Sequence, residues 1–187
     1  MSDKFQGKYR NESARLQNWD YGSNAAYFIT ICTKNREHYL GKIHDGKMMV
    51  SPAGSIAHVL WYEIKNHANN IELGEFVVMP NHVHGILVLN GNDVGTTHAL
   101  SLQSNNDSST IRTENDLSPP GKQRFQNQGK NTISSIVGSY KSAVSKYCNR
   151  LELDFAWQSL FYDHIIRNDE SFQKISEYIK NNPANWP

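Results

Sequence analysis

The period of the hydrophobic pattern changes several times along the chain, and each period predicts one kind of element. A run of β-branched and aromatic residues over 27–33 is typical of a buried strand. Apolar segments at 39–43 and 47–50 flank His44-Asp45-Gly46, where Asp-Gly supplies the positive φ angles of a tight turn. A short hairpin is therefore expected after the first strand.

Two longer apolar runs, at 71–79 and 82–90, are joined by Pro80-Asn81. A proline-asparagine junction favours a turn over continued pairing, so we expect two adjacent antiparallel strands. A shorter apolar segment at 160–166 predicts a last strand.

Apolar positions recur at helical spacing in three other segments. Ser51-Pro52 is a helix-start signal, and the spacing after it predicts an amphipathic helix of about 16 residues. A second helical face extends over 133–147. A third helix is capped by Asn168 or Asp169 and ended by Pro183. The buried stripe of this last helix consists of Phe172, Ile175 and Ile179.

The order of the elements is strand, hairpin, helix, two strands, helix, short strand and helix, which favours an antiparallel sheet with helices packed on it. We expect a ferredoxin-like α+β fold in a single domain over residues 1–187. Between 91 and about 130 the chain is polar, with few large apolar residues. Such a segment buries too little surface to offset the entropy of ordering, so it is predicted to be a flexible insertion.

Hydrophobic residues make up 38% of the 187 residues and charged residues 20%, the balance of an ordinary globular protein. No apolar run approaches the roughly 20 residues that cross a bilayer, and the first ten residues lack the apolar stretch of a secretory signal. The sequence therefore predicts a cytoplasmic protein without a membrane partner. Cys32 and Cys148 form no CxxC pair, so we expect two buried thiols.

The net charge of +1 does not indicate a globally basic nucleic-acid binder, but the charges are unevenly distributed. The segment 117–151 contains no Asp or Glu. Its basic residues give a local field suited to phosphates, although a solvated helix face without a ligand explains them equally well. They are Lys122, Arg124, Lys130, Lys141, Lys146 and Arg150.

The strand predicted over 82–90 begins with two histidines. Because side chains alternate along a strand, His82 and His84 are expected to point to the same face. Two imidazoles at this spacing can chelate one divalent ion, which can polarise a phosphoryl oxygen as a Lewis acid. Surface polar residues produce the same pattern, but here the pair begins an apolar strand, where a polar side chain needs a partner. The pair by itself is an incomplete metal site.

The residues around these histidines resemble a known family. Met79-Pro80-Asn81-His82-Val83-His84-Gly85-Ile86 is similar to the metal-binding strand (His, hydrophobic, His) of the HUH endonucleases, in the form found in single-tyrosine transposases. The match is close to the REP-associated tyrosine transposases. Further matching segments are Arg15-Leu16 with Asp20-Tyr21, then 26–33, and finally 161–168 with Tyr178-Ile179 and Asn182-Pro183.

The resemblance implies that His82 and His84 hold Mg²⁺ or Mn²⁺, and that Tyr178 attacks a phosphodiester in single-stranded DNA. The implied products are a 5′-phosphotyrosine and a free 3′-hydroxyl, which can later rejoin without ATP. Asn182 matches the amide side chain that completes the metal site in the family. Because Asn182 precedes Pro183, we expect it to depart from helical geometry, which weakens the argument from a simple one-turn relation to Tyr178.

Position on the helices separates Tyr178 from the other helical tyrosines. Tyr140 and Tyr147 continue the apolar stripe of the helix over 133–147, so we expect both to pack in the core. Tyr178 lies on the flank of the last helix, with Asn182 one turn further along. A boundary tyrosine with a packed ring and a hydrated hydroxyl explains this position as well.

The resemblance also implies a partner, palindromic or hairpin-forming single-stranded DNA, which in the REP-associated family is a repetitive extragenic palindrome. Lys141, Lys146, Arg150 and Arg167 are candidate contacts to its backbone, and this partner would place the protein at the nucleoid. Two other functions stay open: a non-catalytic DNA-binding module of domesticated transposase origin, and a phosphodiesterase that uses metal-activated water. The oligomeric state also stays open, since related insertion-sequence transposases act as dimers and REP-associated ones can act as monomers.

Overall fold

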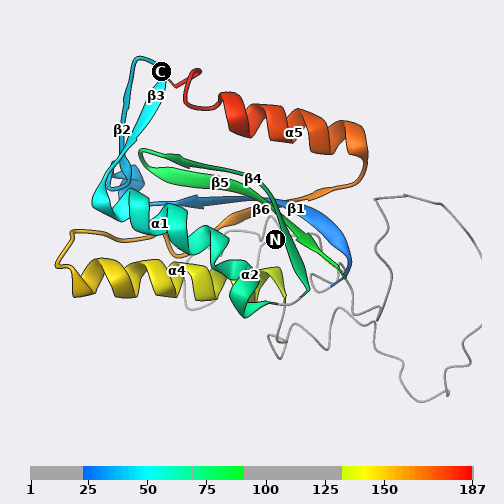
Figure 1. Cartoon of the computed structure of the whole chain (residues 1–187), viewed down its shortest axis with the longest axis horizontal. Helices are drawn as coiled ribbons and strands as arrows, with labels where there is room; N and C mark the ends of the chain where they lie inside the picture. Colours follow the sequence, from blue (N-terminus) through cyan, green and yellow to red (C-terminus); the bar gives the residue numbers. More distant parts are fainter. Residues whose placement is uncertain (1–22, 69, 91–131, 187) are drawn as a thin grey trace, which may run out of the picture.

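The computed structural model of the chain describes residues 23–68, 70–90 and 132–186 (Figure 1). The insertion predicted at 91–130 and the segments Arg15-Leu16 and Asp20-Tyr21 lie outside the described residues. In chain order the elements are β1 (Ala25–Cys32), the 3₁₀ turn η1 (Lys34–Arg36), β2 (Gly41–His44), β3 (Lys47–Val50), α1 (Pro52–Tyr62), α2 (Ile64–His67), β4 (Ile71–Met79), β5 (His82–Leu89), α4 (Ile133–Arg150), β6 (Tyr162–Ile166) and α5 (Asp169–Asn181).

One antiparallel sheet forms the centre of the molecule, with strand order β4-β5-β1-β6. β1 pairs antiparallel with both β5 and β6, and β4 pairs antiparallel with β5. With crossovers through α1 and α4, this is the order of the ferredoxin-like fold, so the predicted α+β class is confirmed. The β2–β3 hairpin is an addition inserted between β1 and α1.

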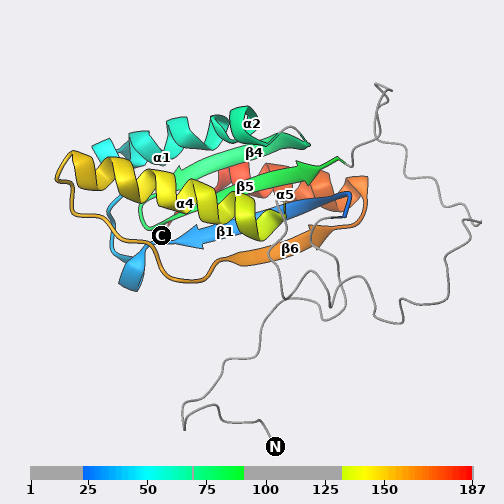
Figure 2. The same ribbon diagram turned by 90° about the horizontal axis from the view of Figure 1, so that it is seen from below.

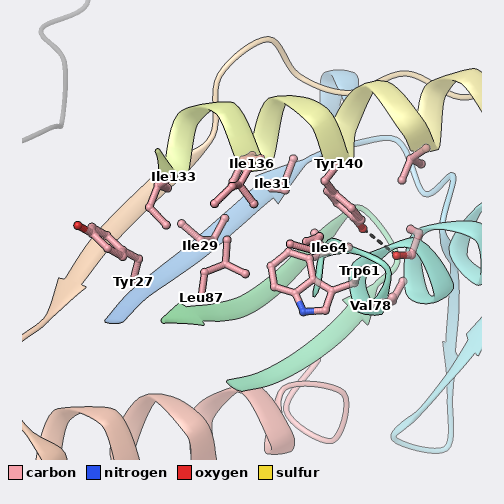
Figure 3. Packing of buried hydrophobic residues seen from close by; sticks show 14 of the residues in the cluster. Tyr27, Ile29, Ile31, Trp61, Ile64, Val78, Leu87, Ile133, Ile136 and Tyr140 are labelled. Carbon is pink, nitrogen blue, oxygen red and sulfur yellow. Dashed lines mark hydrogen bonds between the residues drawn. The ribbon is translucent and has the colours of Figure 1, made fainter. Parts of the chain in front are cut away.

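Helices cover both faces of the sheet. α1, α2 and α4 lie on one face and α5 lies on the other (Figure 1 and Figure 2). The first face holds the larger core (Figure 3), in which Trp61 stacks on Phe76 and the Tyr140 hydroxyl donates a hydrogen bond of 2.9 Å to Ala57 O. The other face holds a smaller core around Ile179 of α5. The face under α5 therefore carries less apolar packing than the first face.

The caps and the turn predicted from the sequence are present. Ser51 Oγ accepts a hydrogen bond of 3.0 Å from the backbone N–H three residues on, at the start of α1. Asn168 Oδ1 accepts the equivalent bond of 2.8 Å at the start of α5. Asp45 and Gly46 form the hairpin turn with φ angles of 50° and 69°. Residues adjacent in the chain thus begin two helices and close the hairpin.

Several details differ from the sequence-based expectations. The first helix breaks at Glu63 into α1 and α2, and the last strand begins at Tyr162. Tyr147, expected in the core, is 47% exposed. The buried stripe of α4 continues from Val144 to Cys148, which leaves Tyr147 on the flank of the helix.

The two cysteines are buried free thiols, as predicted. Burial raises the pKa of both Cys32 and Cys148, so the reactive thiolate form is disfavoured at each. Among the described residues, no helix is both long enough and apolar enough to cross a membrane.

Candidate active site

His82 and His84 begin β5 on the face of the sheet that α5 covers. Ile86, two residues further along the strand, belongs to the small core under α5, so the predicted alternation is confirmed. Both histidine side chains are buried. We refer to His82 and His84 as the histidine pair. Its position places two polar rings at the border of an apolar layer, where each ring needs defined partners.

The two imidazoles converge through their Nε2 atoms, which lie 3.0 Å apart. The Nδ1 atoms are each held by one oxygen: His82 Nδ1 lies 2.7 Å from Asn81 Oδ1. His84 Nδ1 lies 2.8 Å from Thr30 Oγ1 on the neighbouring strand β1. These partners fix the orientation of both rings and direct both Nε2 atoms into one small space.

Burial keeps the histidine pair neutral. Desolvation, assisted by the positive charge of Arg36, lowers the pKa of His82 to about 4. Desolvation also lowers the pKa of His84 to about 3, with further lowering by His82 and Arg36 and an opposing effect of a hydrogen bond at the Ile29 backbone. Both rings are therefore unprotonated at neutral pH, which is the form that binds a metal ion.

The spacing of the two Nε2 atoms fits a divalent ion. Two neighbouring ligands of an octahedral ion with bonds of about 2.1 Å are separated by about 3 Å, close to the 3.0 Å between the Nε2 atoms. No group of three or more His, Cys, Asp or Glu suited to a metal is found in residues 23–68, 70–90 and 132–186. The histidine pair by itself thus offers two nitrogen atoms whose chemistry and spacing suit such an ion.

Tyr178 reaches the histidine pair from α5. Its hydroxyl oxygen lies 3.5 Å from His84 Nε2, at the long limit of a hydrogen bond. Its ring centroid lies 5.4 Å from that of His84 and 6.2 Å from that of Phe28. The side chain is 52% exposed, whereas Ile179 beside it is buried. The predicted flank position is confirmed, and it leaves the tyrosine both close to the histidine pair and accessible to a substrate.

Asn182 follows α5, one turn after Tyr178. Its φ and ψ of −57° and −44° are helical, so the expected departure from helical geometry is wrong. Its N–H bonds to Ile179 O at 3.3 Å, and its own carbonyl accepts from Asn185 N at 3.2 Å. Turns on both sides thus outweigh the steric preference that Pro183 imposes. As far as the described residues go, no hydrogen bond joins the Asn182 amide to the histidine pair.

Sequence patterns do not single out four neighbours of the histidine pair. Thr30 and Asn81 hold the Nδ1 atoms, and Arg36 acts on both rings through its charge. Trp186 packs on His82, with ring centroids 5.9 Å apart. Only Asn81 had a usable signal, because it directly precedes the first histidine. Strand pairing brings in Thr30, the 3₁₀ turn after β1 carries Arg36, and the turns that follow α5 bring in Trp186.

The predicted DNA contacts do not gather at the histidine pair. Lys141, Lys146 and Arg150 belong to α4, on the opposite face of the sheet, and Arg167 is an exposed residue just after β6. Lys141 Nζ donates bonds of 2.7 and 2.9 Å to the carbonyl oxygens of 158–159, and burial lowers its pKa. Lys141 therefore holds the loop that follows α4.

The chain has a relative in Haemophilus influenzae. No protein-family model matches the chain. An uncharacterised protein of Haemophilus influenzae is 34% identical over 188 residues, with 100% of this chain and 96% of that protein covered. The chain belongs to the same family as that protein. The similarity extends over nearly the full length of both proteins.

The fold has a solved counterpart. The structure of a REP-associated tyrosine transposase bound to a REP hairpin matches with a TM-score of 0.52 and 18% identity, covering 94% of this chain and 72% of the other. The match confirms the fold: an antiparallel sheet with helices packed on it.

Proposed function

We propose that the chain is a metal-dependent endonuclease and strand-transferase for single-stranded DNA, a transposase of the single-tyrosine type. One observation carries the proposal: the Nε2 atoms of the histidine pair lie 3.0 Å apart, and the Tyr178 hydroxyl lies 3.5 Å from His84 Nε2. A nucleophile and a pair of metal ligands thus meet from two elements far apart in the chain. The fold shared with a REP-associated tyrosine transposase supports the same assignment.

Tyr178 is the nucleophile in this proposal. Its hydroxyl oxygen forms a bond to phosphorus and loses its proton, while the bond from phosphorus to the 3′-oxygen breaks. The departing 3′-oxygen takes up a proton and becomes a free hydroxyl, and the 5′ end stays on the tyrosine as a phosphotyrosine ester. The ester retains the energy of the phosphodiester, so a DNA 3′-hydroxyl can reverse the step and join strands without ATP.

The histidine pair is proposed to bind the metal ion, with the Asn182 amide as a third protein ligand. A bound Mg²⁺ or Mn²⁺ would supply Lewis-acid polarisation of a phosphoryl oxygen. Thr30 and Asn81 then act as positioning residues. The Nδ1–H of each histidine donates to one of their oxygens, so both Nε2 lone pairs stay free for the ion.

The arrangement supports cleavage by a single chain. Tyr178 lies beside His84 of its own chain, so the nucleophile and the metal ligands need no second copy to meet. We propose a hairpin-forming or palindromic single strand as the DNA partner, which the hairpin bound by the structure of similar fold supports. Lys146, Arg150 and Arg167 are proposed backbone contacts. The DNA partner would place the enzyme at the nucleoid.

Incubation with Mn²⁺ and a 3′-labelled palindromic single strand tests the proposal. The labelled fragment lies downstream of the cut, so it is expected to migrate with the protein on a denaturing gel. Tyr178→Phe should abolish the adduct, whereas Tyr62→Phe, which changes another half-exposed tyrosine on α1, should keep it.

An adduct that survives Tyr178→Phe would overturn the nucleophile. Cleavage without an adduct would indicate the phosphodiesterase that uses activated water. Tight binding without cleavage would indicate the non-catalytic DNA-binding module.

A further inference from the structure

A second candidate surface lies on the face of the sheet opposite the histidine pair. The last turns of α4 and the loop that follows them border an open groove of about 890 Å³. We call it the basic groove. Its lining includes Lys141, Ser145, Lys146, Asn149, Arg150 and Trp157.

The lining of the basic groove suits a sugar-phosphate backbone. Lys146 and Arg150 are exposed and stand one turn apart on α4, so they face the same side. Neither forms an ion pair within the described part of the chain. No lining residue is acidic. Glu152 and Asp154, the acidic residues of the adjoining loop, lie outside the lining. Two free cations beside hydroxyl and amide groups are the donors that bind phosphate oxygens.

The wall of the basic groove is held in place before any ligand binds. Lys141 Nζ bonds to the carbonyls of 158–159. Gln158 N–H bonds to Cys32 O at 2.8 Å, and Lys34 N–H bonds to Ala156 O at 2.9 Å. The loop therefore continues the sheet beside the end of β1, and a ligand need not order it.

The same loop connects the basic groove to the histidine pair. Cys32, which receives the bond from Gln158, is the register partner of His82. Further along, Tyr162 is the register partner of Thr30, whose hydroxyl holds His84. Tyr162 is 48% exposed and begins β6, an edge strand of the sheet. A bound DNA strand that leaves the groove at this loop thus passes Tyr162 on the way to the histidine pair.

We propose that the basic groove binds the backbone of a single-stranded DNA segment next to the cleavage site, and that Tyr162 stacks on one of its bases. The path turns around a sheet edge, which a single strand follows readily. A duplex, with a persistence length of about 50 nm, does not. The inference rests on the proposed function for the choice of DNA, but its test requires binding alone.

Binding is measured in the full chain carrying Tyr178→Phe, with a DNA hairpin that has or lacks a single-stranded extension of about ten nucleotides. Each single-strand phosphate contact contributes about 0.7 to the slope of log K against log salt. Lys146→Ala/Arg150→Ala should therefore reduce the magnitude of the slope by about 1.4. With equal binding at 1 M salt, this makes binding of the extended hairpin about 25-fold weaker at 0.1 M salt. The hairpin without the extension should bind as before. The control Lys42→Ala/Lys65→Ala removes the same charge from exposed sites outside the groove.

Tyr162→Ala should weaken binding of the extended hairpin without changing the salt slope, because stacking releases no counterions. Tyr162→Phe keeps the ring and should bind like the parent protein. An unchanged slope in the groove variant would overturn the groove assignment, and an equal loss with both DNAs would overturn its preference for a single strand. Failure of the proposed function is a separate result: no adduct with the wild-type chain, whatever these binding constants are.

Discussion

Removing the hydrogen bond between Thr30 and His84 tests whether Thr30 orients the histidine pair. Thr30→Val keeps the size of the side chain and removes the oxygen that lies 2.8 Å from His84 Nδ1. Since His84 is 6% exposed, water cannot easily replace this partner, and the ring loses the contact that orients it. Loss of such an outer partner typically lowers metal affinity about 10- to 100-fold, or about 1.4 to 2.8 kcal/mol.

Calorimetric titration with Mn²⁺ measures the effect of Thr30→Val directly. Thr30→Ser keeps the hydroxyl and is expected to bind Mn²⁺ like the wild type. Adduct formation by Thr30→Val should recover at saturating Mn²⁺, because Tyr178 is unchanged. Urea unfolding establishes that each variant is folded. Wild-type Mn²⁺ affinity in a folded Thr30→Val protein would refute the positioning role of this hydroxyl.

Gly85→Ala is expected to lower the free energy of unfolding by about 1–3 kcal/mol, because an added Cβ would lie 2.2 Å from the Trp61 ring; urea denaturation measures it, and an unchanged midpoint would contradict this close contact. Gly138→Ala, on an open side of α4 with nothing within 4 Å, should instead raise that free energy by about 0.4–1 kcal/mol. The metal-free fold should lose stability as the pH falls from about 6.5 towards 4. In this range histidines of the unfolded chain bind protons, whereas the histidine pair in the folded protein, with pKa values of about 4 and about 3, does not. This contribution is fully present above the unfolded pKa, and thermal unfolding that is independent of pH in that window would argue against neutral buried rings. Arg36→Gln should raise the pKa of both histidines, because the positive charge that lowers them is removed; NMR titration of the metal-free protein detects the change.

Local features of this protein follow from the sequence alone. The alternation that puts both histidines on one face, the caps at Ser51 and Asn168, and the Asp45-Gly46 turn each depend on residues adjacent in the chain. The flank position of Tyr178 follows in the same way from the apolar stripe of one helix. A strand or helix expresses these preferences wherever it is packed, which is why the pattern predicts them.

The tertiary structure decided which of these features meet. Thr30 and His84 are 54 residues apart, and Tyr178 and His84 are 94 apart, so only the pairing of β1 with β5 and the packing of α5 bring them together. Which distant strands pair, and in which register, depends on how the helices bury the faces of the whole sheet, and no single segment of the sequence encodes this. For the same reason Lys141, a candidate DNA contact by its charge, holds a loop, and Tyr147, expected in the core, is about half exposed.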